Sequence, residues 1–173
     1  MGRITIVQGE HAVSGDPGKS IHTLLGSCVA VCLLDPVRRI GGMNHFLLGE
    51  PQGGVRQQDL SRYGIHAMEL LVNALMRQGC ERGHLRAHLY GGATMIEGLG
   101  DIGRHNALFA RRFCRTEGIE VRHEDIGGRL ARRVEFLPHQ GRSRCNLVRE
   151  PLPNLPPAVL PVPLADAGEL ELF

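Results

Sequence analysis

Apolar residues dominate two runs in the first third of the chain, Ile21 to Leu34 and Met43 to Leu48. In the first run, alternate positions on both faces of an extended strand are apolar, and one face carries Val29, Val31 and Leu33. A strand with two apolar faces is typically covered on both sides. Asp35-Pro36 ends this run, and a short polar segment leads into the second. The two runs therefore predict a buried β-hairpin.

Helical periodicity is clearest between Ile65 and Met76, where apolar residues recur three and four positions apart. The stripe consists of Ile65, Met68, Leu71, Val72, Leu75 and Met76, and Gly79 follows it. This pattern predicts an amphipathic helix after a polar loop from Glu50 to Ser61. A second helix is predicted from Gly103 to Arg115, with Gly118 just past its end.

Shorter alternating segments predict the remaining strands: Ile4–Gly9, His84–Leu89, Ile119–Ile126, Arg132–Leu137 and Arg144–Arg149. The Gly-Glu-His run at residues 9–11 and the Ser14–Gly18 segment are predicted to be loop and turn. Together these elements predict an α+β fold: a single domain over residues 1–150 with mixed β-sheet layers and two main helices packed on one side.

Prolines recur from Pro151 to Pro163, which excludes a helix or a central strand there. Residues 151–173 are therefore expected to form an extended, Pro-rich C-terminal tail. The last residues, Glu169 to Phe173, alternate and could add an edge strand or dock against the domain.

Length and composition fit this picture of one domain. The chain has 173 residues, 42% of them hydrophobic and 22% charged, which is typical of a soluble globular protein with a substantial core. No apolar stretch approaches the roughly 20 residues that a membrane span needs. The N-terminus lacks the apolar core of a secretory signal, so we expect a cytoplasmic protein.

The net charge does not favour nucleic-acid binding. Lys plus Arg minus Asp plus Glu is 20 − 18 = +2, and the arginines are scattered as single residues and pairs. They form either a solvated basic surface or a surface that meets an acidic protein partner, and the sequence leaves both interpretations open.

Five cysteines without the spacing of a disulfide scaffold predict reduced thiols, most of them buried. Cys28 differs because it directly follows Gly26-Ser27 at the entrance to the first apolar run. A glycine there permits close backbone approach, and neighbouring N–H groups can point toward a developing oxyanion. His45, in the partner strand of the hairpin, can face Cys28 and act as its base. If it does, Cys28 should react below the usual thiol pKa; core packing remains the alternative for this cysteine.

Two other groups invite a chemical interpretation. His84 and His88, with Cys80 upstream, suggest a metal site, but strand alternation separates them and they supply few ligands for closed zinc coordination. We therefore expect no metal. Cys32 could act as a resolving thiol for Cys28 in a thiol oxidoreductase, although a core position suits it better.

Several segments together resemble the chemoreceptor glutamine deamidase family, CheD. The segments are Leu25–Pro36, Gly41–Leu48, Tyr63-Gly64, Gly91–Met95, Asn106 and Asp125–Arg129, and they span most of residues 5 to 150. The resemblance implies a protein-glutamine glutaminase, a cysteine-dependent amidohydrolase that converts receptor glutamines to glutamate with release of ammonia. It needs no metal or organic cofactor.

The resemblance also implies roles for individual residues. Cys28 would be the nucleophile, His45 the base and Thr23 the third catalytic residue, although some relatives place a threonine where this chain has His22. Gly26, Ser27 and Asn44 are expected to line the substrate or the oxyanion. The implied partners are methyl-accepting chemotaxis receptors, through their cytoplasmic helical region, and a CheC-type phosphatase. A non-catalytic module that binds receptors or such a phosphatase is the alternative function.

Overall fold

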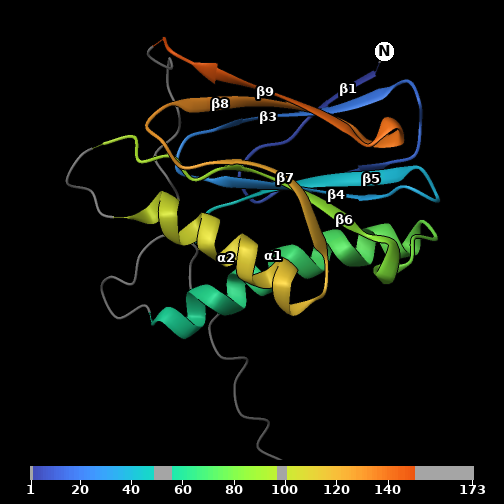
Figure 1. Ribbon diagram of the computed structural model, residues 1–173, viewed down its shortest axis with the longest axis horizontal. Helices are drawn as coiled ribbons and strands as arrows, with labels where there is room; N and C mark the ends of the chain where they lie inside the picture. Colours follow the sequence, from blue (N-terminus) through green and yellow to red (C-terminus); the bar gives the residue numbers. More distant parts are fainter. Residues whose placement is uncertain (1, 49–55, 97–100, 151–173) are drawn as a thin grey trace, which may run out of the picture.

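The computed structural model describes residues 2–48, 56–96 and 101–150 (Figure 1). Its elements in chain order are β1 (Gly2–Thr5), β2 (His11–Ser14), β3 (Lys19–Leu25), β4 (Val29–Asp35), β5 (Ile40–Phe46), α1 (Gln57–Arg77), β6 (Arg86–Gly91), α2 (Ile102–Thr116), β7 (Glu120–Ile126), β8 (Ala131–Leu137) and β9 (Arg142–Val148). Single 3-10 turns at Arg82–His84 and Pro138–Gln140 complete them. The Pro-rich tail predicted at residues 151–173 lies outside the described residues.

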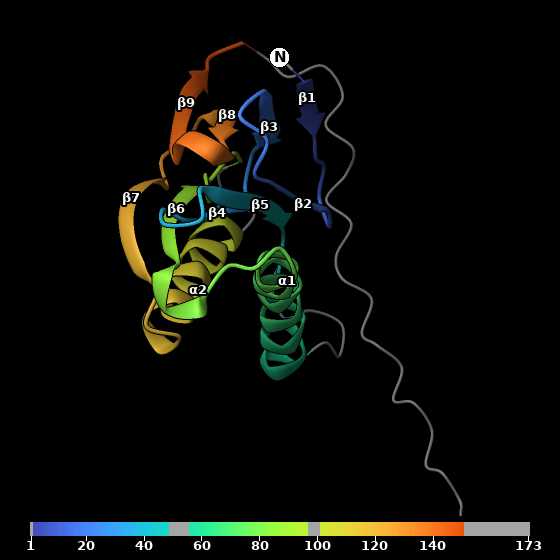
Figure 2. The same ribbon diagram turned by 90° about the vertical axis from the view of Figure 1, so that its right-hand side faces the viewer.

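Three layers make up the domain, as the view in Figure 2 shows. An outer sheet has the order β1-β3-β8-β9, and a central sheet has the order β2-β5-β4-β6-β7. Helices α1 and α2 lie together against the face of the central sheet that points away from the outer sheet. Both sheets mix parallel and antiparallel pairs. The predicted α+β class, with two helices on one side of mixed sheets, is confirmed.

Strand β4 is the middle of the core. All seven of its residues are buried. Val29, Val31 and Leu33 pack toward the helices, whereas Ala30, Cys32 and Leu34 pack toward the outer sheet. Strand β5 pairs with β4 antiparallel. Both the hairpin and the burial of β4 on two faces were predicted from the sequence, and both are confirmed.

The first apolar run is not one strand, and that expectation was wrong. Residues 19–25 form β3 in the outer sheet, and the strand that starts at Val29 belongs to the central sheet. Gly26, Ser27 and Cys28 carry the chain from one sheet to the other. Because both strands face the space between the sheets, the apolar pattern continues across the bend and conceals it. Cys28 therefore lies in a connection rather than within a strand.

Several boundaries also differ from the prediction; β1, for example, spans Gly2–Thr5 where a strand was predicted at Ile4–Gly9. His11 and Ser14 were expected to lie in a loop and a turn, but residues 11–14 form the short edge strand β2, which pairs with β5. Its burial is only partial, so it lacks a strong apolar signature. Helix α1 begins at Gln57, inside the segment expected to be loop; Gln58 and Asp59 in its first turn are polar, so no apolar stripe marks its start.

Candidate functional site

The connection that carries Cys28 is held by backbone hydrogen bonds from the segment after β6. Gly92 N donates to the carbonyl oxygen of Cys28 at 2.8 Å, and Ala93 N donates to that of Gly26 at 3.1 Å. Gly91 has a φ of 106°, and a Cβ at this position would collide with the Cys28 carbonyl. Only glycine permits this approach. The predicted Gly-Gly segment thus supports the backbone beneath the thiol.

Asn106 of α2 supports the same connection from the helical layer. Its Nδ2 donates to the carbonyl oxygen of Ser27 at 2.9 Å, and its Oδ1 accepts from Leu48 N at 2.9 Å. Asn106 is fully buried, so its own amide has no water as a substitute partner. The sequence placed Asn106 on the stripe of the second predicted helix and among the residues of the family resemblance, without assigning it a role. A buried asparagine on the apolar stripe of a helix was the available signal.

His45 is buried in β5, on the side of the central sheet that faces the outer sheet. Its Nδ1 lies 2.8 Å from Oγ1 of Thr23, which comes from β3 in the outer sheet. The Thr23 hydroxyl donates its single hydrogen to the carbonyl oxygen of Ile6 at 2.9 Å. Toward His45 it must therefore act as an acceptor, and Nδ1 carries the ring proton. The other ring nitrogen, Nε2, is then the basic one.

The free nitrogen of His45 faces no hydrogen-bond partner. Nε2 is buried and has none among the residues that the structure describes. An unpaired buried nitrogen is costly in a resting structure, and such atoms occur where a reaction needs them. A neutral imidazole with Nδ1 protonated and Nε2 open is the form that a general base requires.

Cys28 lies on the same side of the central sheet. Ala30 is the residue directly opposite His45 in the β4–β5 pair, and Cys28 precedes Ala30 by two positions. Cys28 also packs against the apolar cluster between the two sheets. Cys28 and His45 therefore both border the space between the two sheets, with Cys28 directly before the first residue of β4. In the structure its thiol donates to Oε1 of Gln8 at 3.8 Å.

Burial sets the protonation of both groups. Desolvation raises the pKa of the Cys28 thiol to about 11, although the backbone N–H of Cys28 opposes the rise. Desolvation also lowers the pKa of His45 to about 4, against the attraction of Glu10. At neutral pH the two groups are therefore a thiol and a neutral imidazole, not a preformed thiolate–imidazolium pair. This differs from the reactive free thiol expected from the sequence, because the site is more buried than the sequence indicated.

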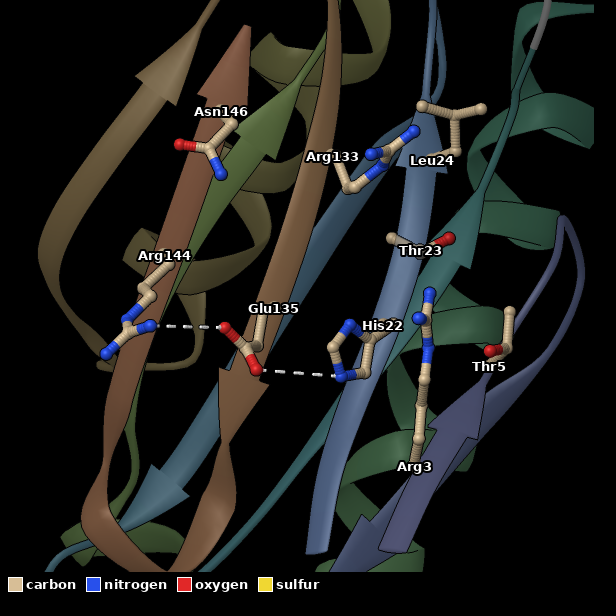
Figure 3. Close-up of a pocket in the computed structure, with 9 residues that line it drawn as sticks. All are labelled: Arg3, Thr5, His22, Thr23, Leu24, Arg133, Glu135, Arg144 and Asn146. Carbon is tan, nitrogen blue, oxygen red and sulfur yellow. Dashed lines mark ion pairs between the residues drawn. The ribbon is translucent and has the colours of Figure 1, made fainter. Parts of the chain in front are cut away.

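His22 lies on the opposite face of β3 from the Thr23 hydroxyl. Its Nε2 is 2.8 Å from Oγ of Ser20 and 3.7 Å from a carboxylate oxygen of Glu135. His22 and Glu135 border a polar cavity of about 570 Å³ on the outer surface of the outer sheet (Figure 3). Successive residues of a strand point to opposite faces, so only one of the two candidates can reach His45. The structure brings Thr23, and not His22, to the imidazole.

Asn44 is separated from the other predicted residues by the same alternation. Its Oδ1 accepts from Val31 N at 3.1 Å, and its Nδ2 lies near Ala67 O and Met68 Sδ of helix α1. Asn44 thus faces the helical layer, whereas His45 faces the outer sheet. Gly26 and Ser27 remain beside Cys28 through the chain connection.

The candidate metal ligands are dispersed. His84 Nδ1 lies 3.6 Å from Asp35, and His88 Nδ1 lies 2.7 Å from Ser143 Oγ. Within residues 2–48, 56–96 and 101–150, no three His, Cys, Asp or Glu side chains converge in a way that could hold a metal ion. Over the same residues, neither helix has the length and apolar character to span a bilayer.

The sequence matches one family model and several named proteins. The family model described as CheD chemotactic sensory transduction matches residues 47–146. A protein of Zymomonas mobilis subsp. mobilis named "Probable chemoreceptor glutamine deamidase CheD" is 51% identical over 172 residues, which cover 99% of this chain and 92% of that protein. A Caulobacter sp. protein with the same name is 47% identical over 178 residues, covering 99% and 93%.

Among solved structures, the Bacillus licheniformis hypothetical protein YfiH is similar at a TM-score of 0.43 and 13% identity, covering 66% of this chain and 49% of that one. The sequence relatives extend over nearly the whole chain and include the Cys28 and His45 segments. Because the family model covers more than half of the chain and the identity is close to one residue in two, this chain belongs to the CheD family.

Proposed function

We propose that this protein is a chemoreceptor glutamine deamidase, which hydrolyses glutamine side-chain amides of receptors to glutamate and ammonia. Its relatives at 51% and 47% identity carry that name over almost the full length of both chains. The observation that carries the proposal is the contact between Thr23 and His45, which leaves His45 Nε2 unprotonated and open beside the connection that holds Cys28.

The first half of the reaction begins with proton transfer. His45 Nε2 accepts the thiol proton of Cys28 as Sγ attacks the carboxamide carbon of the substrate, so charge develops only when the substrate is bound. The carbonyl oxygen becomes an oxyanion. The backbone N–H of Cys28, which already favours negative charge on its own sulfur, is placed to donate to it, with Gly26 and Ser27 shaping the turn.

The second half returns the enzyme to its starting state. Protonated His45 gives its proton to the amide nitrogen, the C–N bond breaks, and ammonia leaves a thioester on Cys28. His45 then takes a proton from water, which attacks the thioester carbon, and the C–S bond breaks. The sum is one water consumed, one ammonia released and one glutamine converted to glutamate. Thr23 keeps the imidazole in one orientation and one tautomer throughout.

The proposed substrate also indicates where the protein works and with which partners. Residues 1–150 form the catalytic domain, with residues 151–173 as an appended tail, and the protein works in the cytoplasm on the helical region of methyl-accepting receptors. A new carboxylate on a receptor helix changes local charge and becomes available for methylation. A CheC-type phosphatase is the further partner that we propose for this family member.

Mass spectrometry of a receptor cytoplasmic fragment tests the activity. Incubation with the wild-type protein should convert specific glutamines to glutamates, and Cys28→Ala should abolish the conversion. Cys145→Ser is the matched control, since Cys145 is also partly exposed but lies in β9, which β8 separates from the strand of Thr23. Equal conversion by wild type and Cys28→Ala would reject the thiol mechanism.

A second candidate function is a non-catalytic module that binds an acidic face of a receptor or of a CheC-type phosphatase. Arg3, Arg133 and Arg144 border the outer-sheet cavity, on the side of β3 opposite the Thr23 hydroxyl, and favour this idea through charge complementarity. Receptor binding by both wild type and Cys28→Ala, with conversion by neither, would select the module over the enzyme.

A further inference from the structure

Helix α2 carries the excess positive charge of the chain. Residues 102–116 contain four arginines and no carboxylate, a net charge of +4 (4 − 0), whereas the rest of the chain totals −2 (16 − 18). The basic character of this protein is therefore a local property of one helix and not of its whole surface.

Three of the four arginines share the side of α2 that faces solvent. Arg104, Arg112 and Arg115 are exposed, and Leu108 lies between them with 40% of its surface exposed. These four positions are separated by four, four and three residues, so they form one stripe, which we call the α2 face. The buried residues of the helix are on its other side: Gly103, Asn106, Ala107, Ala110, Phe113 and Cys114. Figure 2 shows α2 on the outside of the molecule, beside α1.

The arginines of the α2 face have no carboxylate partner within the protein. Among the residues that the structure describes, the ion pair of this helix joins Arg111 to Glu124 at 2.6 Å, and none involves Arg104, Arg112 or Arg115. Opposite charges three or four residues apart stabilise an exposed helix, whereas like charges at that spacing destabilise it. Folding stability therefore does not account for the α2 face, and a negatively charged partner does.

The α2 face begins near the proposed nucleophile. Asn106, in the second turn of the helix, donates to the Ser27 carbonyl at 2.9 Å, so α2 starts beside the connection that carries Cys28. From Arg104 to Arg115 the face extends about 16 Å along the helix axis. Two helices side by side are about 20 Å wide. A helical bundle that presents a side chain to Cys28 is thus wide enough to reach the α2 face as well.

The chemistry of the α2 face fits an acidic protein better than a membrane or a nucleic acid. A helix that enters a membrane surface needs a free apolar side, but the apolar side of α2 is packed in the core. Nucleic-acid binding is typical of a broader basic surface, and the chain outside α2 is net negative. An apolar residue surrounded by arginines is the composition of a protein interface. Each turnover of the proposed reaction leaves a glutamate on a receptor helix, which supplies the matching charge.

We propose that the α2 face is a docking surface for receptor helices that already carry glutamates near the target glutamine, so that the enzyme binds a receptor more tightly as its neighbouring sites become charged. The proposal rests on the proposed deamidase function and adds to it a dependence of affinity on the state of the receptor. None of the four residues supplies a group to the reaction at Cys28. The effect is therefore expected in Kd and KM, with kcat unchanged.

The experiment uses two receptor cytoplasmic fragments with the same target glutamine, one with glutamate and one with alanine at the neighbouring modification positions. The test variant is Arg104→Gln/Arg112→Gln, which removes two charges and keeps good helix formers. Mass spectrometry gives kcat and KM for both fragments. Kd is measured separately in proteins that also carry Cys28→Ala, so that binding is observed without turnover.

Arg38→Gln/Arg142→Gln is the matched control, because it removes the same charge from two exposed arginines elsewhere. Arg38 lies in the turn after β4, beyond the end of that strand that is remote from Cys28. Arg142 pairs with Leu137, at the end of β8 remote from the residues that pair with the last residues of β3. A general attraction between a basic protein and an acidic fragment would change equally in the test and control variants.

Wild type should bind the glutamate fragment about fivefold more tightly than the alanine fragment at low salt, with KM lowered in proportion, and the difference should shrink at about 0.5 M salt. Arg104→Gln/Arg112→Gln should reduce the difference to less than about twofold with kcat retained, which reports an intact fold and site. The control should keep the wild-type difference.

A preference that is absent in wild type, that persists in the test variant or that falls equally in the control overturns the proposal. So does binding to phosphatidylglycerol vesicles that depends on the two α2 arginines when binding to the fragments does not. A wild type that binds the glutamate fragment with the expected preference but converts neither fragment refutes the deamidase function and leaves the docking surface in place.

Discussion

The hydroxyl of Thr23 accepts a hydrogen bond from Nδ1 of His45 at 2.8 Å, although the two residues belong to different sheets. Thr23 can do this only because its own proton is donated to Ile6 O. A backbone carbonyl, rather than a carboxylate, is thus the last member of the chain that orients the base. This arrangement fixes the orientation and the tautomer of the imidazole, but it adds no negative charge beside the ring.

Replacement of Thr23 should reveal a positioning role. Thr23→Val keeps the shape but removes the acceptor, so the ring loses its tautomer preference, and kcat should fall by about 10- to 100-fold with little change in KM. Thr23→Ser restores the hydroxyl and should recover most of the activity. Deamidation kinetics on a receptor fragment measure both variants. Equal rates for the valine and serine variants would assign Thr23 to packing alone.

Alkylation of Cys28 should be slow in the resting enzyme. Burial raises the pKa of this thiol to about 11, so iodoacetamide should label it slowly at neutral pH and faster as the pH rises toward that value. His45→Ala should change this labelling little, yet reduce turnover by about 100-fold or more, because the imidazole acts only when substrate is bound. Rapid labelling at pH 7 that disappears in His45→Ala would indicate a preformed ion pair instead.

Acid should destabilise the fold through His45. Its pKa is lowered to about 4 in the folded protein from an ordinary value of 6.5, because burial disfavours the imidazolium. The stability that comes from the neutral ring is therefore present above pH 6.5 and is lost as the pH falls toward 4, at a cost of about 3 kcal/mol. Urea unfolding at several pH values should show this loss in wild type. His45→Gln, which cannot titrate, should show a shallower dependence over the same interval.

Asn106 should matter for both stability and activity. Asn106→Leu removes the partner of the Ser27 carbonyl and of the buried Leu48 N–H, at a cost of about 1–3 kcal/mol of folding free energy. The connection that carries Cys28 then loses its support from α2, so kcat should fall as well. Thermal unfolding and deamidation assays measure the two effects. Asn73 of α1, which is exposed, provides the control substitution Asn73→Leu.

A thiol oxidoreductase would require Cys32 as the resolving thiol, whereas the deamidase does not use it. Cys32 is fully buried in β4, and burial raises the pKa of its thiol. Cys32→Ala should therefore leave deamidation within about threefold of wild type after correction for any lost stability, since it removes only a small packed side chain. A complete loss of activity in a folded Cys32→Ala protein would require a role for this thiol.

The sequence predicted the β4–β5 hairpin and the helices well, because their periodicity is local. It did not predict the break at Gly26–Cys28, since β3 and β4 both bury residues between the sheets and the apolar pattern runs on through the bend. The choice between Thr23 and His22 depended on the pairing of β3 with β8 and on which face of β3 meets the central sheet. The catalytic roles of Cys28, His45 and Thr23 stay predictions until the variants are assayed.

The contact of Gln8 with Cys28 and the strand β2 could not be predicted from the sequence pattern, for a related reason. The contact of Gln8 with Cys28 joins positions 20 residues apart, and it depends on a turn attached to the edge of β5. Short, half-exposed segments such as β2 are defined by the strand that they join rather than by their own composition.

The proposed base, His45, and the residue proposed to orient it, Thr23, come from separate sheets, so their contact exists only while the two sheets keep their relative position. Phe136 and Val134 of β8 pack in the space between them and hold that alignment. A slide of the outer sheet by one residue would move the Thr23 hydroxyl about 3.3 Å along β3 and out of hydrogen-bond distance of His45 Nδ1, with every strand still formed. Activity therefore requires more than folded strands and helices: it also requires one relative position of the two sheets.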